Sequence, residues 1–245
     1  MNGIDFLGAL RADGAALAAA ARRGLDQQVP ACAGWTVADL VLHTGMVHRH
    51  KTEIVRGRLA EPPQPWPPSA PAREELPGWY EQGLEELATV LEAEDLETRV
   101  WTWYEPDQTV AFWRRRMAHE TAVHRVDAES AHGQPDPVPA ALAADGVGEL
   151  LEVFLAPHAE GEAVGGRGEL LHLHATDAEG EWQVRLLPAG VEVERGHGKG
   201  DAAARGSASD LLLFLWGRGS AERLERFGDV ALLARVRELA AEATQ

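Results

Sequence analysis

A glutamate and a histidine, Glu120 and His124, lie on the apolar stripe of a predicted helix. The helix should run from Val110 to Ala131, because its apolar residues recur at steps of three and four, as in a helix that faces a core. One turn places the two polar side chains about 6 Å apart. A buried carboxylate is costly to desolvate alone, so it needs a partner, and a shared metal ion would satisfy both side chains.

A second helix that can supply another ligand is predicted over residues 36–56. Thr36 and Asp39 have the spacing of a capping box, which marks the start of this helix, and Gly57 is expected to end it.

This second helix carries two histidines, His43 and His50, on its apolar stripe. They lie about 10 Å apart along the axis, too far for both to bind one ion. We expect His43 to be the ligand, because its neighbours Leu40 and Val47 should make its position the more buried one. His43, Glu120 and His124 would leave one coordination position open, which is the pattern of catalytic zinc.

Spacing alone leaves a plainer interpretation open. Glu120 and His124 can form a satisfied buried pair, since polar residues four positions apart are common on helices. His43 can equally be a core histidine bonded to a backbone carbonyl.

Two longer segments carry a resemblance to a known family: TVADLVLH at residues 36–43 and VAFWRRRMAHETAVHRVDAE at residues 110–129. They closely resemble the maleylpyruvate isomerase family of actinobacterial mycothiol-dependent enzymes, and the resemblance spans nearly the whole chain. It implies a DinB-like four-helix bundle that binds zinc through a histidine of the second helix and the glutamate and histidine of the longer segment. These residues match His43, Glu120 and His124.

Composition indicates a protein of the cytoplasm. The formal charge of −16 over 245 residues argues against nucleic acid or an anionic membrane as a partner, since phosphate binding needs basic patches. The run Arg114–Arg116 is too short to change this, and on a helix its members point in different directions, with one inward contact expected. No stretch of about 20 apolar residues and no signal pattern is present. We expect a monomer.

The chain has one cysteine, Cys32, in a loop that precedes the second helix. A single cysteine excludes an internal disulfide and a cysteine-rich zinc site. No neighbour in the sequence would activate the thiol as a nucleophile, so we expect Cys32 to be a small packing residue. A thiol-dependent reaction would then draw its sulfur from an external molecule.

The first part of the chain is predicted to be a helical domain over residues 1–157. Helices are expected at residues 6–23, 36–56, 79–92 and 110–131, and four such helices can form a bundle whose core holds a metal. The proline-rich segment 61–71 should be an extended crossover. A further helix is expected at residues 139–156.

The second part, residues 158–245, is predicted to be a small α+β domain, which makes the whole chain α+β. Strands are expected at residues 169–175, 181–186 and 191–194, followed by helices at 210–216 and 230–243. His172 and His174 share one face of the first strand, a spacing that can bind metal. Because Leu171 and Leu173 occupy the opposite face, we interpret the histidines as solvent-facing and assign them no chemistry.

The resemblance also implies a sterol-carrier-like fold for this second domain and an arginine there that serves the active site. Arg218 is the best match, between two glycines just after an apolar helix. The alternative is that Arg218 caps the carbonyls of that helix.

The reaction that the family implies is cis–trans isomerisation of a dicarboxylic enoyl acid by reversible addition of mycothiol, with zinc stabilising the thiolate. The same thiolate could instead be transferred to an electrophile, which would make the protein a mycothiol S-transferase. A non-catalytic module that binds a metal or an apolar ligand is a further alternative. The expected partners are therefore mycothiol and a small electrophilic or carboxylate substrate.

Overall fold

The computed structural model describes residues 3–66 and 69–244, which form two compact units divided between Asp136 and Pro137. This division falls about one helix earlier than the predicted domain boundary after residue 157. The reason is that α5 (Ala140–Glu149) packs extensively against α7 (Ala208–Leu215), far along the chain, and so belongs to the C-terminal unit.

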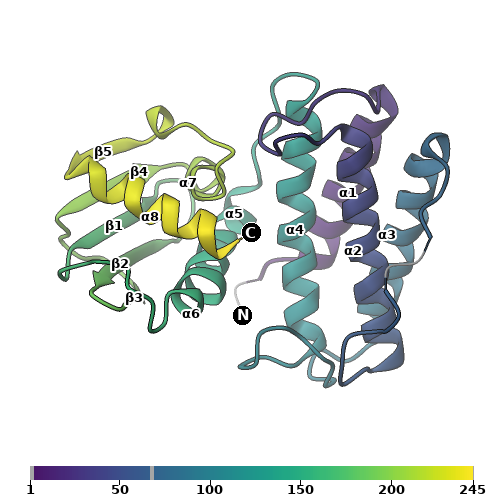
Figure 1. The fold of residues 1–245 in the computed structure, drawn as a ribbon, viewed down its shortest axis with the longest axis horizontal. Helices are drawn as coiled ribbons and strands as arrows, with labels where there is room; N and C mark the ends of the chain where they lie inside the picture. The colour runs from purple at the N-terminus through teal and green to yellow at the C-terminus, as the bar shows by residue number, and fades with distance from the viewer. Residues whose placement is uncertain (1–2, 67–68, 245) are drawn as a thin grey trace. The chain divides into compact units, whose positions relative to one another are not determined.

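The N-terminal unit is a bundle of four long helices (Figure 1). They are α1 (Phe6–Arg23), α2 (Val37–Gly57), α3 (Leu76–Ala93) and α4 (Val110–Ser130). Helix α1 packs mainly along α4, and α2 mainly along α3. A short 3-10 helix, η1 (Arg73–Glu75), leads into α3. The predicted four-helix bundle is confirmed.

The start of α2 is the predicted capping box. The Thr36 backbone N–H donates to the Asp39 carboxylate at 2.8 Å, and the Asp39 N–H donates back to the Thr36 hydroxyl at 3.4 Å. The end differs from the prediction, because Gly57 is still helical and Arg58 adopts the left-handed conformation with φ of 46°. Its N–H bonds the carbonyls of Ile54 and Val55 and closes the helix there.

Helix α4 is buried on nearly all sides, and the apolar residues of its predicted stripe are covered. Val110, Trp113 and Met117 are each at most 1% exposed. Helix α2 buries a stripe that differs slightly from the predicted one, running through Val41, Thr44, His48, Thr52 and Val55. The candidate ligand of α2 therefore lies at the edge of the buried face of this helix.

The crossover from α2 to α3 is irregular up to η1, as expected for its prolines, and residues 67–68 of the predicted segment lie outside the described residues. Among the described helices, none is both long and apolar enough to span a membrane.

The C-terminal unit begins with one continuous helical segment. The segment consists of α5, a π-helical stretch at Leu150–Leu155 (η2) and a last turn, α6 (Ala156–His158). It corresponds to the helix predicted at residues 139–156.

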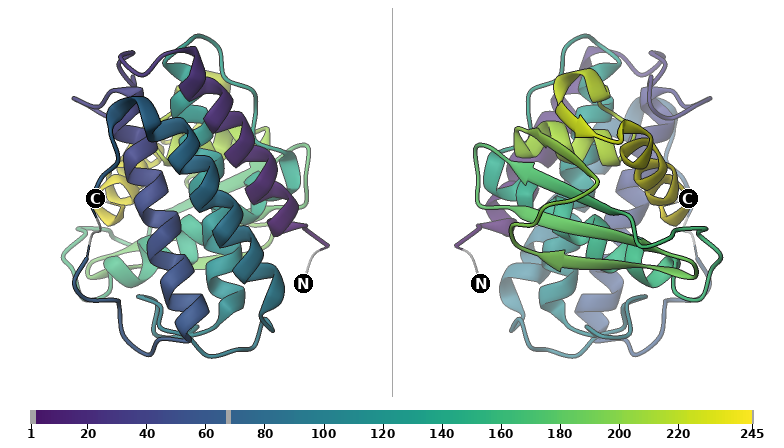
Figure 2. Two further views of the ribbon diagram at one scale, coloured as in Figure 1. Left: turned by 90° about the vertical axis from the view of Figure 1, so that its right-hand side faces the viewer. Right: turned by 90° about the vertical axis from the view of Figure 1, so that its left-hand side faces the viewer.

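The remainder of this unit is a five-stranded sheet with helices (Figure 2). The sheet order is β3-β2-β1-β4-β5, and only the β1–β4 pair is parallel. The strands are β1 (Leu170–Ala175), β2 (Glu181–Leu187), β3 (Gly190–Arg195), β4 (Ala202–Gly206) and β5 (Glu225–Gly228). The first three were predicted, and the last two were not.

Helices cover one face of this sheet. Helix α7 packs on β1 and β4, and α8 (Val230–Ala243) packs on β4, with the short η3 (Ala221–Arg223) between them in the chain. Leu171 and Leu173 point to this face and are fully buried. The predicted α+β class is confirmed.

Candidate metal centre

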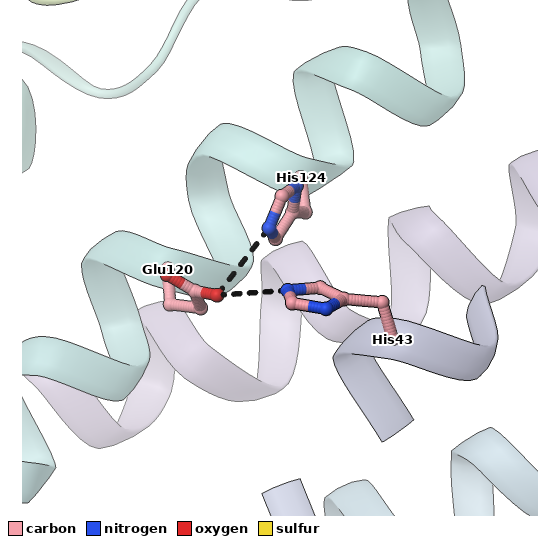
Figure 3. Close-up of side chains that lie close together, drawn as sticks. All are labelled: His43, Glu120 and His124. Carbon is pink, nitrogen blue, oxygen red and sulfur yellow. Dashed lines mark ion pairs between the residues drawn. The ribbon is translucent and has the colours of Figure 1, made fainter. Parts of the chain in front are cut away.

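The three predicted ligands lie together inside the bundle (Figure 3). They are His43 of α2 and Glu120 and His124 of α4, here called the bundle cluster. The Oε1 atom of Glu120 lies 3.3 Å from Nε2 of His124 and 3.6 Å from Nε2 of His43. Because one nitrogen from each ring and one carboxylate oxygen all lie within 4.8 Å of one another, a single ion can contact all three residues.

The bundle cluster is buried on one side and accessible on the other. The side chain of His124 is 11% exposed and that of Glu120 is 17% exposed, whereas that of His43 is 39% exposed. The access lies on the α2 side because His43 is at the edge of the buried stripe. His43 and His50 are both half-buried, so burial does not separate the two histidines, and it is the direction of the His43 side chain toward Glu120 that sets it apart.

The other histidine considered as a ligand, His50, points elsewhere. Its ring packs against Trp66 with centroids 4.8 Å apart, and its Nδ1 accepts a hydrogen bond from Lys51 at 2.9 Å. The fully buried histidine of α2 is His48, whose Nε2 lies 2.9 Å from the Thr121 hydroxyl of α4. Burial lowers the pKa of His48 to about 3, so this ring is neutral and joins α2 to α4 next to the bundle cluster.

His124 is oriented by a buried aspartate, Asp127. The Nδ1 of His124 lies 3.0 Å from Oδ2 of Asp127, whose side chain is fully buried. This contact leaves Nε2 of His124 directed at Glu120. A carboxylate behind a histidine is the usual support of a metal ligand, since it fixes the ring and the tautomer.

The same aspartate accepts a hydrogen bond from the thiol of Cys32. The Sγ of Cys32 lies 3.7 Å from Oδ2 of Asp127, so the predicted loop position places this cysteine behind the bundle cluster. A thiolate there would put a second negative charge beside the carboxylate. This neighbour fits the expectation that Cys32 is not the nucleophile.

Glu120 is held from its other side by Arg116, which is one turn earlier on α4 and donates to Oε2. Arg116 is 5% exposed and is the inward-pointing member of the arginine run. Lys51 lies nearby, with its ammonium 4.6 Å from the centre of the Trp113 ring. Burial lowers the pKa of Lys51 to about 8, and the charge of Glu120 opposes part of this effect.

These charges decide the protonation of the bundle cluster. Burial opposes the ionised form of Glu120, but the positive charges of Arg116 and His124 outweigh it and hold the pKa of Glu120 well below its ordinary value. Burial likewise opposes the charged form of His124, but Glu120 and Asp127 raise the pKa of His124 to about 9. At neutral pH a glutamate anion therefore faces a histidine cation, and a metal ion would replace the proton of that cation.

The sequence pattern gave no role to three residues near the cluster, Asp127, Lys51 and His48, and predicted for the arginine run only one inward contact, which is made by Arg116. Two of these four follow from helical spacing, because Asp127 is three residues after His124 and Arg116 is four before Glu120. The position of Lys51 near the cluster could not be predicted from helical spacing, because Lys51 lies on α2 and contacts Trp113 of α4 only in the folded bundle.

Arg218 belongs to the C-terminal unit and follows α7. Its guanidinium donates to the backbone carbonyl of Trp216 at 2.7 Å and lies 5.9 Å from the centre of the Trp216 ring. This hydrogen bond to a carbonyl at the end of α7 is the contact expected from the alternative interpretation, in which Arg218 caps that helix.

The fold and the site define a two-domain protein in which a helical bundle with a His-Glu-His cluster precedes a small α+β domain. The family model described as mycothiol maleylpyruvate isomerase N-terminal domain matches residues 7–129, and the one described as MDMPI C-terminal domain matches residues 141–235. The chain belongs to the mycothiol maleylpyruvate isomerase family and is an enzyme of this kind.

Solved structures agree with this fold. The chain is similar to the crystal structure of a mycothiol-dependent maleylpyruvate isomerase, with 15% identity over 91% of both chains and a TM-score of 0.64. A histidine-to-alanine mutant of a mycothiol-dependent maleylpyruvate isomerase matches with the same identity and coverage and a TM-score of 0.61. No curated protein matches the chain.

Proposed function

We propose that the protein is a zinc-dependent enzyme that activates mycothiol and catalyses cis–trans isomerisation of a maleylpyruvate-like acid. The observation that carries the proposal is the convergence of His43, Glu120 and His124 in a chain of this family. A cytoplasmic location and a monomeric state remain predictions.

The geometry of the bundle cluster suits a tetrahedral ion. Ligands at about 2.1 Å from a tetrahedral Zn²⁺ lie about 3.4 Å from one another. The two distances from Glu120 Oε1, 3.3 Å to His124 and 3.6 Å to His43, are close to this edge length. Two nitrogens and one oxygen would hold the ion and leave one position for a fourth ligand, as in catalytic zinc sites.

A Zn²⁺ ion there would supply the positive charge that keeps a thiol in its thiolate form near neutral pH. The chain itself fixes the ligands. Asp127 holds the ring of His124, and Arg116 holds the second oxygen of Glu120, so the ligand atoms are oriented before any ion arrives.

The isomerisation follows from reversible addition of the mycothiol thiolate to the activated double bond. A carbon–sulfur bond forms, the carbon–carbon double bond becomes single, and rotation about it is then free. The same carbon–sulfur bond breaks in the reverse step, which releases the trans isomer and returns the thiol unchanged. We assign the thiol to mycothiol because Cys32 lies behind His124, against the carboxylate of Asp127.

We assign Arg218 as the group that would bind a substrate carboxylate. A guanidinium can donate two parallel hydrogen bonds to a carboxylate. This role requires Arg218 to exchange its contact with the Trp216 carbonyl for the substrate, and we propose it on the resemblance to the family.

The metal part of the proposal is tested by elemental analysis of the purified protein. His43→Ala, Glu120→Ala and His124→Ala should each remove most of the zinc at the bundle cluster, because three protein ligands leave little redundancy. Full retention of that ion in all three variants would contradict the assignment.

The chemical part is tested by supplying mycothiol together with maleylpyruvate or with a neutral electrophile. We expect trans product without consumption of mycothiol. Stoichiometric loss of mycothiol into a conjugate, with no isomerisation, would identify a mycothiol S-transferase instead.

A further inference from the structure

A second group of metal-ligating side chains lies in the C-terminal unit, on the sheet face opposite to Leu171 and Leu173. We call it the strand cluster. Its members are His172, His174 and Glu181, whose ligand atoms all lie within 4.8 Å of one another, and His197, which contacts the same carboxylate. Strand β1 contributes two of the histidines, and Glu181 lies directly opposite His174 in the antiparallel β1–β2 register. The third histidine comes from the connection between β3 and β4. Four side chains from three parts of the chain thus converge.

The three imidazoles all contact one carboxylate. Nε2 of His172 lies 2.9 Å from Oε2 of Glu181, and Nδ1 of His174 lies 3.0 Å from Oε1. Nδ1 of His197 lies 2.9 Å from Oε2. The interpretation of His172 as solvent-facing is therefore wrong, because its partners bury it to 7% exposure.

The strand cluster has a buried base and an open rim. The side chains of Glu181 and His174 are 27% and 34% exposed, and that of His197 is 82% exposed. An ion can therefore reach the cluster from solvent, and the ring of His197 can move to meet it.

The carboxylate of Glu181 is the charged centre of the strand cluster. Burial opposes the ionised form of Glu181, but hydrogen bonds from His197 and His172 outweigh it and lower the pKa of the glutamate. The ring of His172 lies 5.2 Å from that of His197 and 6.1 Å from that of His174, so the three rings are grouped closely around this carboxylate. The ring nitrogens that contact Glu181 would bind the ion in place of their protons, because a histidine ligand must be deprotonated at the ligating nitrogen.

We propose that the strand cluster is a second metal site, which binds a divalent transition-metal ion that prefers imidazole, such as Zn²⁺. A tetrahedral ion needs its ligands about 3.4 Å apart, so the present contacts of 2.9–3.0 Å widen by roughly half an ångström through small side-chain rotations. Imidazole-rich sites select zinc, copper or nickel over magnesium or calcium.

The ion at the strand cluster is structural. When His197 rotates in as the fourth protein ligand, the tetrahedral site is closed, which is the pattern of structural rather than catalytic zinc. The ion joins the β3–β4 connection, through His197, to strands β1 and β2. Its effect is therefore on the stability of the C-terminal unit, in contrast to the bundle cluster with its three ligands.

The test is the zinc content of the full-length protein after equilibration with micromolar free Zn²⁺. We expect two ions per chain in the wild type and one in the double variant His172→Ala/His174→Ala. The matched control is His158→Ala, an exposed histidine of the same unit outside the strand cluster, which should keep both ions. A double variant that binds as many zinc ions as the wild type would overturn the proposal.

A second measurement leaves the sheet untouched. The variant His43→Ala/His124→Ala lacks the bundle cluster but keeps the strand cluster. One zinc ion per chain should therefore still bind, and by mass action it should raise the melting temperature. A melting temperature that is unchanged by zinc in this variant would refute the strand site. Whether this variant loses the ion of the bundle cluster tests only the proposed function. The hypothesis of a zinc site at the bundle cluster and that of a zinc site at the strand cluster can therefore be refuted separately.

Discussion

Replacing Asp127 by asparagine should weaken zinc binding at the bundle cluster without removing a ligand. The carboxylate of Asp127 is fully buried, lies 3.0 Å from Nδ1 of His124, and leaves Nε2 of that ring directed at Glu120. The amide keeps the size but loses the charge that fixes the tautomer and raises the basicity of the ring. Such supporting groups are worth about 10- to 100-fold in metal affinity, which corresponds to roughly 1.4–2.7 kcal/mol.

The assay is competition for zinc with a chromophoric chelator at fixed pH. The matched control is Glu129→Gln, the same chemical change on the same helix, because Glu129 pairs with Arg125 at 2.8 Å and does not touch the bundle cluster. We expect the control to keep the wild-type affinity. An unchanged dissociation constant in folded Asp127→Asn, or an equal loss in Glu129→Gln, would refute the reasoning.

Three further predictions concern proton release, the thiol and the carboxylate anchor. The pKa of His124 is about 9 in the metal-free bundle, where Glu120 and Asp127 outweigh burial, so the ion must displace a proton at lower pH. Affinity should fall up to tenfold per unit below about pH 9, and a dissociation constant that is constant between about pH 6 and 8 would contradict this. Cys32→Ser should keep nearly full turnover with mycothiol; loss of turnover with zinc and folding intact would place the nucleophile in the protein. Arg218→Ala should keep zinc content and melting temperature but lower turnover of a carboxylate substrate about 10²-fold, with poor rescue by lysine, whereas an equal small effect on a neutral electrophile would make Arg218 only a helix cap.

The helices were predictable because their information is local. The limits of α1 and α8 agree with the pattern of apolar residues, and the capping box at Thr36 and Asp39 marks the start of α2. The end of α2 was predicted one residue too early, because Arg58 rather than Gly57 takes the left-handed position.

Strands β4 and β5 could not be predicted, because their pairing is not local. Strand β4 has the sequence Ala-Ala-Ala-Arg-Gly, which has no strand propensity, and its parallel partner β1 lies about thirty residues earlier. All four residues of β5 are exposed, so this strand shows no alternation of apolar and polar positions. Pairing along the sheet, rather than side-chain pattern, determines both strands.

The bundle cluster and the strand cluster also differ in how far local sequence patterns could predict them. Glu120 and His124 were found from one turn of one helix, and His43 from a second helix of the same pattern. The strand cluster was missed because Glu181 and His197 come from separate segments that only the sheet brings to His172. Alternation with leucines correctly assigned the histidines to the opposite face, but it could not show what else lies on that face.

An anomalous-difference map from crystals grown with zinc tests the central claim most directly. We predict a peak within about 2.0–2.2 Å of Nε2 of His43, Nε2 of His124 and the carboxylate of Glu120. Crystals without a peak at this position, from protein that still isomerises its substrate with mycothiol, would contradict the account.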